Sequence, residues 1–212
     1  MVPTIHHHIT SAMVLIAVYN PVSGDRRAKS VLLQHTLPLL ASHSIPIDGV
    51  FATEHTSHAG QIVSDIIRKS GEHRIQVVLC SGDGTLHDII NGISVDGEVN
   101  AVEFILIPCG TANALYSSLF PPNSSQPNDS AYMLQSLHSH LRKSHARPLY
   151  VAVNTISSSA SASPIEVLST VVTSTCLHAS ILRDSESLRE EFPGVDRFVV
   201  NLLLFRYDSL TM

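Results

Sequence analysis

The stretch IQVVLCSGDGTLHDIINGI, residues 75–93, places three local patterns in immediate succession. Residues 75–80 form a short apolar run, which is typical of a strand buried on both faces of a parallel sheet. Residues 81–84 contain two glycines and an aspartate, and from Gly84 onward the apolar residues recur at helical spacing. A buried strand, a glycine-rich turn and a helix in this order predict one unit of a parallel α/β sheet.

The same alternation continues on both sides of this stretch. Strands are predicted at 13–19, 47–54, 75–80 and 102–108, and helices at 28–43, from about 57 to 70, and at 84–93, 110–120 and 131–144. Pro38 should kink the first of these helices, because proline lacks the backbone N–H that a helix interior needs. Since the links are short, we expect a parallel sheet covered by helices on both faces.

The sequence changes character after Arg147. Two segments rich in Val, Thr and Ile, 147–156 and 165–175, flank a serine-rich link at 157–163, which predicts the beginning of an antiparallel β region. We therefore divide the chain into an N-terminal leader, an α/β nucleotide-binding domain and a partial β-rich domain, at 1–11, 12–145 and 146–212.

Composition limits the class of protein. Hydrophobic residues make up 44% of the 212 residues and charged residues 15%, which favours a buried core over disorder. A formal net charge of -5 does not favour a nucleic-acid binder. The three cysteines fit neither a zinc site nor a disulfide framework and suit a reducing compartment. No apolar stretch approaches the ~20 residues of a membrane-spanning helix. We expect a cytoplasmic protein whose contact with membranes is peripheral.

Loops of the kind that receive phosphates follow three of the predicted strands: NPVSGDRR at 20–27, SGDG at 81–84 and PCGTAN at 108–113. Ligands of open α/β sheets bind at the carboxyl ends of the strands, where glycines let backbone N–H groups approach an anion. The helix from Gly84 directs its positive end to the same place. Each loop alone fits a plain turn equally well, but three at one edge favour a phosphate ligand. The chain has neither a P-loop motif nor a complete dinucleotide fingerprint.

The loops, in this order, resemble those of the diacylglycerol kinase catalytic family of lipid kinases, in particular its sphingosine and ceramide kinase branch. The matching stretches are NPVSG, TEHTSHA, SGDGTLHDIING and PCGTANAL, at 20–24, 53–59, 81–92 and 108–115, with a weaker match at 178–198. The resemblance implies an α/β domain of the NAD kinase/diacylglycerol kinase type, followed by the beginning of a β-sandwich. It also implies ATP as phosphoryl donor, Mg²⁺, and a lipid hydroxyl as acceptor.

The resemblance also implies roles for single residues. Nucleotide binding falls to Asn20, Ser23, Arg26, Thr53, Ser81, Gly82, Gly84, Thr85, Gly110, Thr111, Asn113 and Arg197. Asp83 is the candidate catalytic residue, which either accepts the proton of the acceptor hydroxyl or organises Mg²⁺; the plain alternative is a turn-forming Asp-Gly. Asp88 is a second candidate for metal, or for a loop amide. For Arg26 a solvated surface charge is an equally good interpretation.

The lipid acceptor is less well defined. Asp184 begins a DSES element that resembles an acidic element near the acceptor in sphingosine kinases. The resemblance places Asp184 and Glu186 near the acceptor, although a solvated face is as good an interpretation. Ser180 occupies the position where those enzymes carry an acidic residue for the sphingoid amine. This departure weakens the case for a free sphingoid base and leaves ceramide, diacylglycerol or another lipid alcohol open.

Three hypotheses follow. The first is a lipid kinase. The second is a truncated, catalytically inactive nucleotide-binding protein, because residues 146–212 are fewer than a complete β-sandwich of the family needs. The third is a NAD kinase, which the PCGTAN element at 108–113 disfavours.

Overall fold

The computed structural model describes residues 13–70, 74–94, 102–122, 129–157, 163–171, 173–174, 176–192 and 194–202. The predicted leader, 1–11, lies outside the described residues.

Four parallel strands form the central sheet, as predicted. They are β1 (Val14–Tyr19), β2 (Gly49–Ala52), β3 (Ile75–Ser81) and β4 (Val102–Pro108), in the order β2-β1-β3-β4. All seven residues of β3 are buried. The chain runs outward from β1 to β2 and then crosses to β3 on the other side of β1. The carboxyl ends of β1 and β3 therefore form the switch point at which α/β sheets bind ligands.

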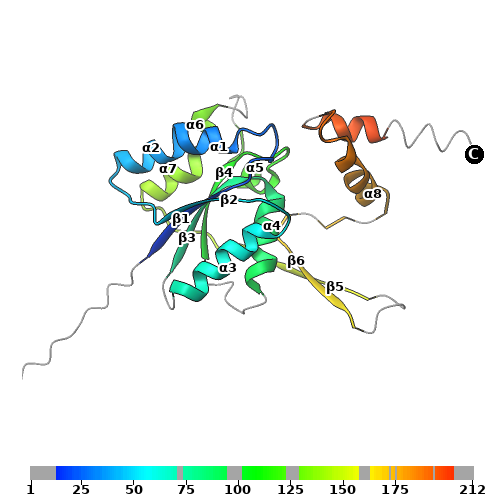
Figure 1. Ribbon diagram of the computed structural model, residues 1–212, viewed down its shortest axis with the longest axis horizontal. Coiled ribbons are helices and arrows are strands. Elements are labelled where there is room, and N and C mark those ends of the chain that lie inside the picture. Colours follow the sequence, from blue (N-terminus) through cyan, green and yellow to red (C-terminus); the bar gives the residue numbers. More distant parts are fainter. Residues whose placement is uncertain are drawn as a thin grey trace, which may run out of the picture.

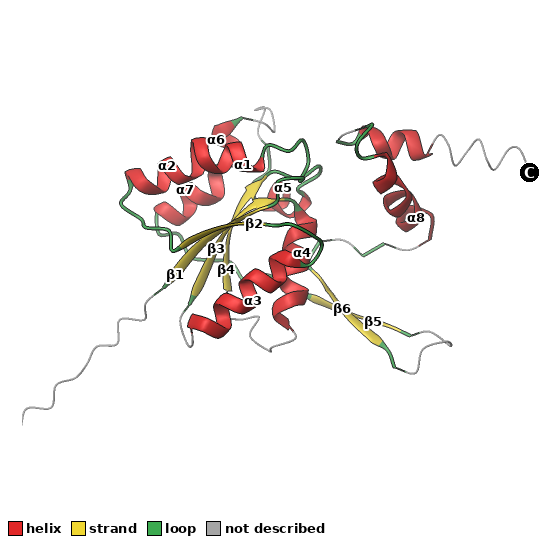
Figure 2. Ribbon diagram, in the orientation of Figure 1, coloured by secondary structure: helices red, strands yellow, loops and turns green. Residues whose placement is uncertain are grey.

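Helices cover both faces of the sheet (Figures 1 and 2). On one face lie α1 (Ala28–Val31), the π-helical turn η1 (Leu32–Thr36), α2 (Leu37–Ser42), α6 (Ser130–Met133) and α7 (Gln135–Leu141). On the other lie α3 (His58–Ser70) and α4 (Asp83–Ser94). Leu15 and Ala17 of β1 pack toward the first group, whereas Ile16 and Val18 pack toward the second. This alternation explains why the strand is apolar throughout.

Two predicted helices differ in detail from the structure. The helix with Pro38 passes from α to π geometry over Leu32–Thr36 and returns to α geometry at Leu37. Pro38 has no N–H to donate to the preceding turn. The structure therefore has a wider, π-helical turn where the sequence predicted a kink. The helix predicted at 131–144 is two helices, α6 and α7, which meet at Leu134.

The helix predicted at 110–120 begins later than expected. α5 runs over Ala114–Leu119, because its N-cap residue, Asn113, has a left-handed backbone (φ 49°, ψ 49°). Residues 110–113 therefore precede the helix, which begins its hydrogen bonding with the Ser117 N–H donating to the Asn113 carbonyl at 3.0 Å.

The second part of the chain begins with an antiparallel hairpin of β5 (Ala152–Ile156) and β6 (Ile165–Ser169), which confirms the predicted start of a β region. The side chain of Asn91 in α4 fixes this hairpin to the α/β domain. Its amide nitrogen donates to the Leu168 carbonyl and its oxygen accepts from the Leu168 N–H, each at 2.9 Å. Beyond the hairpin the described residues are largely helical, which the sequence analysis did not predict: α8 (Cys176–Asp184), η3 (Ser185–Leu188) and a helix at 196–202.

Candidate functional site

A cavity of about 990 Å³ lies at the carboxyl edge of the sheet. It is lined by the loops that follow β1, β2, β3 and β4 and by three charged residues from the helical segment after the hairpin. The three glycine loops predicted from the sequence therefore do meet at one site, and a fourth loop, after β2, joins them. The position agrees with the switch point between β1 and β3.

Backbone contacts between glycines bring the loops together. A Cβ atom at Gly110 would lie 2.4 Å from the Cα of Gly82, and one at Gly82 would lie 2.8 Å from the Cα of Gly110. Gly24 has φ +53°, and a Cβ there would lie 2.6 Å from the carbonyl oxygen of Cys109. Real Cβ atoms do not approach backbone this closely, so these three positions require glycine for loop packing as well as for access to an anion.

A chain of polar side chains links the loops after β1 and β3. Asn20 donates to the Thr85 hydroxyl at 3.3 Å, the Thr85 and Ser81 hydroxyls lie 2.6 Å apart, and Ser81 donates to Ser23 at 3.3 Å. Ser23, Ser81 and Thr85 are all buried. Four residues predicted to bind nucleotide are therefore hydrogen-bonded to one another, and these bonds hold the two loops together.

Asp83, the candidate catalytic residue, is the first residue of α4 and lines the cavity. Its two carboxylate oxygens accept hydrogen bonds from the backbone N–H groups of Ala114, at 2.7 Å, and Leu115, at 3.2 Å. Asp83 thus caps the N-terminus of α5, whose own N-cap residue makes no side-chain capping bond. A carboxylate offers about four lone-pair sites, so roughly half of its accepting capacity stays available toward the cavity.

Asn113 closes the third loop on itself. Its side-chain oxygen accepts from the Gly110 N–H and its amide nitrogen donates to the Gly110 carbonyl, each at 2.8 Å. Both polar ends of the side chain are therefore occupied within the loop. Asn113 lines the cavity, but its observed bonds position the backbone of 110–113. Thr111, from the same loop, also lines the cavity.

The remaining predicted residues of the α/β domain differ in placement. Thr53 and Gly84 line the cavity. Asp88 lines it as well, and its Oδ2 atom accepts from the Ser57 N–H at 3.2 Å, the loop amide that the sequence analysis gave as its alternative role. Arg26 is exposed, has φ 64° and is not among the residues that line the cavity, so the structure does not bring it to the site.

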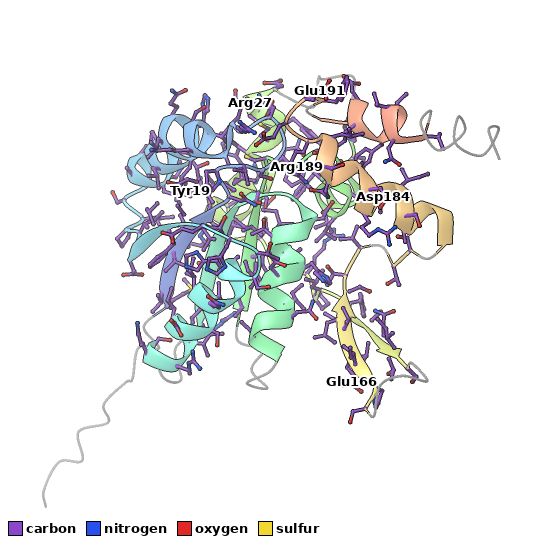
Figure 3. The ribbon with its side chains drawn as sticks, turned by 45° about the vertical axis from the view of Figure 1, so that its right-hand side comes forward. Tyr19, Arg27, Glu166, Asp184, Arg189 and Glu191 are labelled. Carbon is purple, nitrogen blue, oxygen red and sulfur yellow. The ribbon has the colours of Figure 1, made fainter. Side chains whose placement is uncertain are left out.

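Three residues of the helical segment line the cavity. Arg197 was predicted to bind nucleotide and Glu186 to lie near the acceptor, whereas Arg189 was not predicted. The Arg197 side chain is 4% exposed, donates to the Gly194 carbonyl at 2.8 Å and lies 4.4 Å over the Phe198 ring. Burial lowers the pKa of Arg197, and the neighbouring positive charge of Arg189 adds to that effect. Arg189 pairs with Glu186 through two hydrogen bonds of 2.9 Å. Arg197 also lies 3.6 Å from Glu186. The helical segment, on which Figure 3 labels Arg189, therefore gives the cavity a wall of two guanidinium groups and one carboxylate, which is net positive.

Two of the residues predicted near the acceptor, Asp184 and Ser180, are not in this wall. Asp184 pairs with Arg183 at 2.7 Å, and neither Asp184 nor Ser180 lines the cavity. In Figure 3 Asp184 lies on α8, farther from the sheet than Arg189. Sequence reasoning missed Arg189, two residues after the DSES element, because no local pattern distinguishes it from the other arginines nearby.

In the part of the chain that the structure describes, neither a metal-binding cluster nor a reactive thiol accompanies the site. Among the described residues no group of three or more His, Cys, Asp or Glu side chains could hold a metal ion. Cys80 and Cys109 are free and buried, and burial raises the pKa of Cys109 to about 12, so its thiol stays protonated at neutral pH.

Comparison with known protein families identifies the family of this chain. The profile of the diacylglycerol kinase catalytic domain matches residues 14–151, and the chain belongs to this family of lipid kinases. This confirms the resemblance seen in the sequence. None of the described helices is both long enough and apolar enough to cross a membrane.

This chain covers only about a quarter of the length of the curated relatives described next. Human sphingosine kinase 1 is 33% identical over 109 residues, which cover 50% of this chain and 27% of the human protein. Sphingosine kinase 1 of Arabidopsis thaliana is 26% identical over 125 residues, 55% of this chain and 24% of the plant protein. The crystal structure of a diacylglycerol kinase from Bacillus anthracis str. Sterne aligns with a TM-score of 0.48 and 20% identity, covering 67% of this chain and 43% of the bacterial one.

Proposed function

We propose that the chain binds ATP with Mg²⁺ in the cavity at the carboxyl edge of the sheet and transfers the γ-phosphoryl group to the hydroxyl of a lipid. The observation that carries the proposal is the meeting of three glycine loops and two arginines around one cavity. A volume of about 990 Å³ lies at the upper end of the usual range for small-molecule sites, roughly 300–1,000 Å³.

The described groups fit a triphosphate. Backbone N–H groups of glycine loops, the N-terminus of α4, and the guanidinium groups of Arg189 and Arg197 are all favourable partners for phosphate oxygens. The Nε atom of Arg197 is buried and has no hydrogen-bond partner among the described residues. Because an unsatisfied buried donor is costly, an anion in the cavity would relieve this deficit.

Asp83 supplies the base in this proposal. Its bonds to the N–H groups of Ala114 and Leu115 fix the carboxylate at the cavity wall. The carboxylate accepts the proton of the lipid hydroxyl as the oxygen–phosphorus bond forms, and the bond to the leaving ADP oxygen breaks. Mg²⁺ would supply neutralisation of the phosphate charge. Asp88, with one oxygen already bonded to Ser57, would be a ligand of this ion, and Asp83 would be its ligand only in the alternative role, in which it does not act as the base.

A second candidate function is nucleotide binding without transfer. The specific observation in its favour is that Asp83 already caps α5, a structural role that requires no chemistry. The acceptor also stays open, with ceramide, diacylglycerol and a sphingoid base as candidates, because neither Asp184 nor Ser180 lines the cavity. Since lipid alcohols reside in membranes, we place the activity in the cytoplasm at a membrane surface.

Two measurements test these proposals. Thermal unfolding of the purified chain with and without Mg²⁺-ATP tests binding, because a ligand at a hundred times its dissociation constant stabilises by ~2.7 kcal/mol. Transfer from radiolabelled ATP to sphingosine, ceramide and diacylglycerol in mixed micelles tests catalysis. Asp83→Asn should lower the transfer rate by about 10²- to 10⁴-fold and retain ATP binding. ATP binding with no transfer to any of the three lipids would leave the second candidate, and a fully active variant would exclude Asp83 as the base.

A further inference from the structure

The two edges of the β5–β6 hairpin differ. The hairpin extends away from the α/β domain (Figure 1), and among the described strands β5 and β6 pair only with each other. At the edge of β6 the Asn91 side chain binds both the N–H and the carbonyl of Leu168. Helix α4 therefore closes this edge, and β5 forms the open one.

The Asn91 bonds also show which backbone groups of β5 point outward. Residue pairs of an antiparallel ladder alternate between hydrogen-bonded and non-hydrogen-bonded. Because both polar backbone atoms of Leu168 bind Asn91, the pair of Leu168 and Val153 is non-hydrogen-bonded. The N–H and carbonyl groups of Val153, and by the same alternation those of Thr155, consequently point away from β6. The open edge thus presents two donors and two acceptors.

Strand β5 lacks the features by which sheet edges usually avoid pairing. Its sequence, AVNTI, contains neither a charged residue nor a proline, and its register with β6 is continuous, without a bulge. The side chains of Val153 and Ile156 are 61% and 56% exposed. Since a two-stranded hairpin is only marginally stable by itself, a third strand at this edge would stabilise it.

We propose that the open edge of β5 binds the same edge of a second copy of the chain, in a homodimer with a continuous sheet of the order β6-β5-β5-β6. A two-fold axis at Asn154 places Val153 of one copy opposite Thr155 of the other, in an antiparallel pair. The outward groups of Val153 and Thr155 then exchange two hydrogen bonds, and the symmetry repeats this pair.

Other properties of the edge also favour a second copy as its partner. Since β5 carries no charge, the two-fold axis places no like charges opposite each other. Ile156 would lie opposite Ala152 of the other copy and lose part of its exposure. Because α4 closes the β6 edge in each copy, the sheet cannot grow further, and pairing stops at two chains. The inference does not depend on the proposed function.

Light scattering and sedimentation of the full chain test the dimer from about 1 µM to 1 mM, because an interface of one strand pair is expected to be weak. Thr155→Pro removes an outward N–H and leaves the hydrogen bonds within the hairpin in place. It should raise the dissociation constant of the dimer at least about tenfold. Thr155→Val keeps the N–H and the branched side chain, so as the matched control it should stay within about threefold of the parent chain.

Hydrogen exchange followed by NMR identifies the surface that pairs. A rising protein concentration should slow exchange of the Val153 and Thr155 amides and leave the Asn154 amide unchanged, because the Asn154 N–H faces β6 at every concentration. In Thr155→Pro the Asn154 amide should keep its protection, which shows that the hairpin is intact. Val153→Lys is a second variant, which retains every N–H and adds the kind of charge that protects natural edges, and it should also weaken the dimer.

A concentration-dependent dimer that both Thr155→Pro and Val153→Lys weaken, with the alternating exchange pattern in the parent chain, would support the proposal. A monomer at every concentration would overturn it. A dimer whose formation slows exchange elsewhere, and not at Val153 and Thr155, would also overturn it. The same holds if Val153→Lys dimerises as tightly as the parent chain.

Discussion

Gly82 and Gly110 illustrate at the scale of the residue why this site needs glycine. The sequence predicted them as points where a backbone approaches a phosphate. In the structure each is also the point where one loop touches the other, since a Cβ on either would fall within 2.8 Å of the partner's Cα. Gly84, in the same SGDG loop, differs, because a Cβ there would meet nothing within 4 Å. Glycines in one motif therefore carry different constraints.

This difference predicts opposite effects for two small substitutions. Gly110→Ala forces the loops after β3 and β4 apart, so we expect it to cost about 1–3 kcal/mol of unfolding free energy and to lower ATP affinity at least about tenfold. Gly84→Ala adds a better helix former to the first turn of α4 without a clash and should stabilise the chain by up to about 1 kcal/mol. Urea unfolding and ATP titration of both variants measure this. Equal stability of Gly110→Ala and the parent chain would contradict the loop packing.

At the scale of the element, regular patterns were predictable and hydrogen bonds between distant segments were not. The four strands and the covering helices follow from apolar runs and helical spacing, and β4 has the predicted bounds, 102–108. The predicted start of α5 was wrong because Asn113 adopts a left-handed backbone and bonds to Gly110. The same holds for Asp83: only the fold brings its carboxylate to the N–H groups of α5. Residue type and spacing predicted most of the residues that line the cavity. They did not predict that many of these side chains form hydrogen bonds within the site.

The contact between α4 and β6 gives a prediction about an element that sequence reasoning did not connect to the site. Asn91 is on α4, the helix that begins with Asp83, and it bonds to both polar backbone atoms of Leu168. Asn91→Ala removes both partners, so the Leu168 amide should lose protection in hydrogen exchange and stability should fall by about 1–3 kcal/mol. Asn91→Asp keeps an acceptor for the Leu168 N–H but lacks the donor for its carbonyl.

The aspartate variant is the internal control. The Leu168 amide should keep most of its protection in Asn91→Asp and lose it in Asn91→Ala. Equal loss in both variants would mean that general destabilisation of α4, and not the hydrogen bond to Leu168, sets the exchange rate. Unchanged protection in Asn91→Ala would mean that the hairpin is held by its other contacts.

At the scale of the whole molecule, the cavity is assembled from parts far apart in the sequence. The loops come from residues 20–113, whereas Arg189 and Arg197 come from a helical segment that follows the β5–β6 hairpin. Because both arginines line the cavity, an anion bound by the loops would also bond to this segment. Ligand binding should therefore stabilise the helical segment against local opening, a coupling that neither part shows alone.

Hydrogen exchange tests this coupling. Mg²⁺-ATP and Mg²⁺-tripolyphosphate should both slow exchange in η3 and in the helix at 196–202, because in the proposed complex the phosphates would lie between the loops and the arginines. Arg197→Ala should abolish the slowing and weaken both ligands by about tenfold or more, since hydrogen bonds between charged groups contribute about 1.5–3 kcal/mol each. Arg183→Ala is the matched control, because Arg183 pairs with Asp184 and does not line the cavity. Slowed exchange confined to the loops would show that the segment does not close on the ligand, and the positive wall would then play no part in phosphate binding.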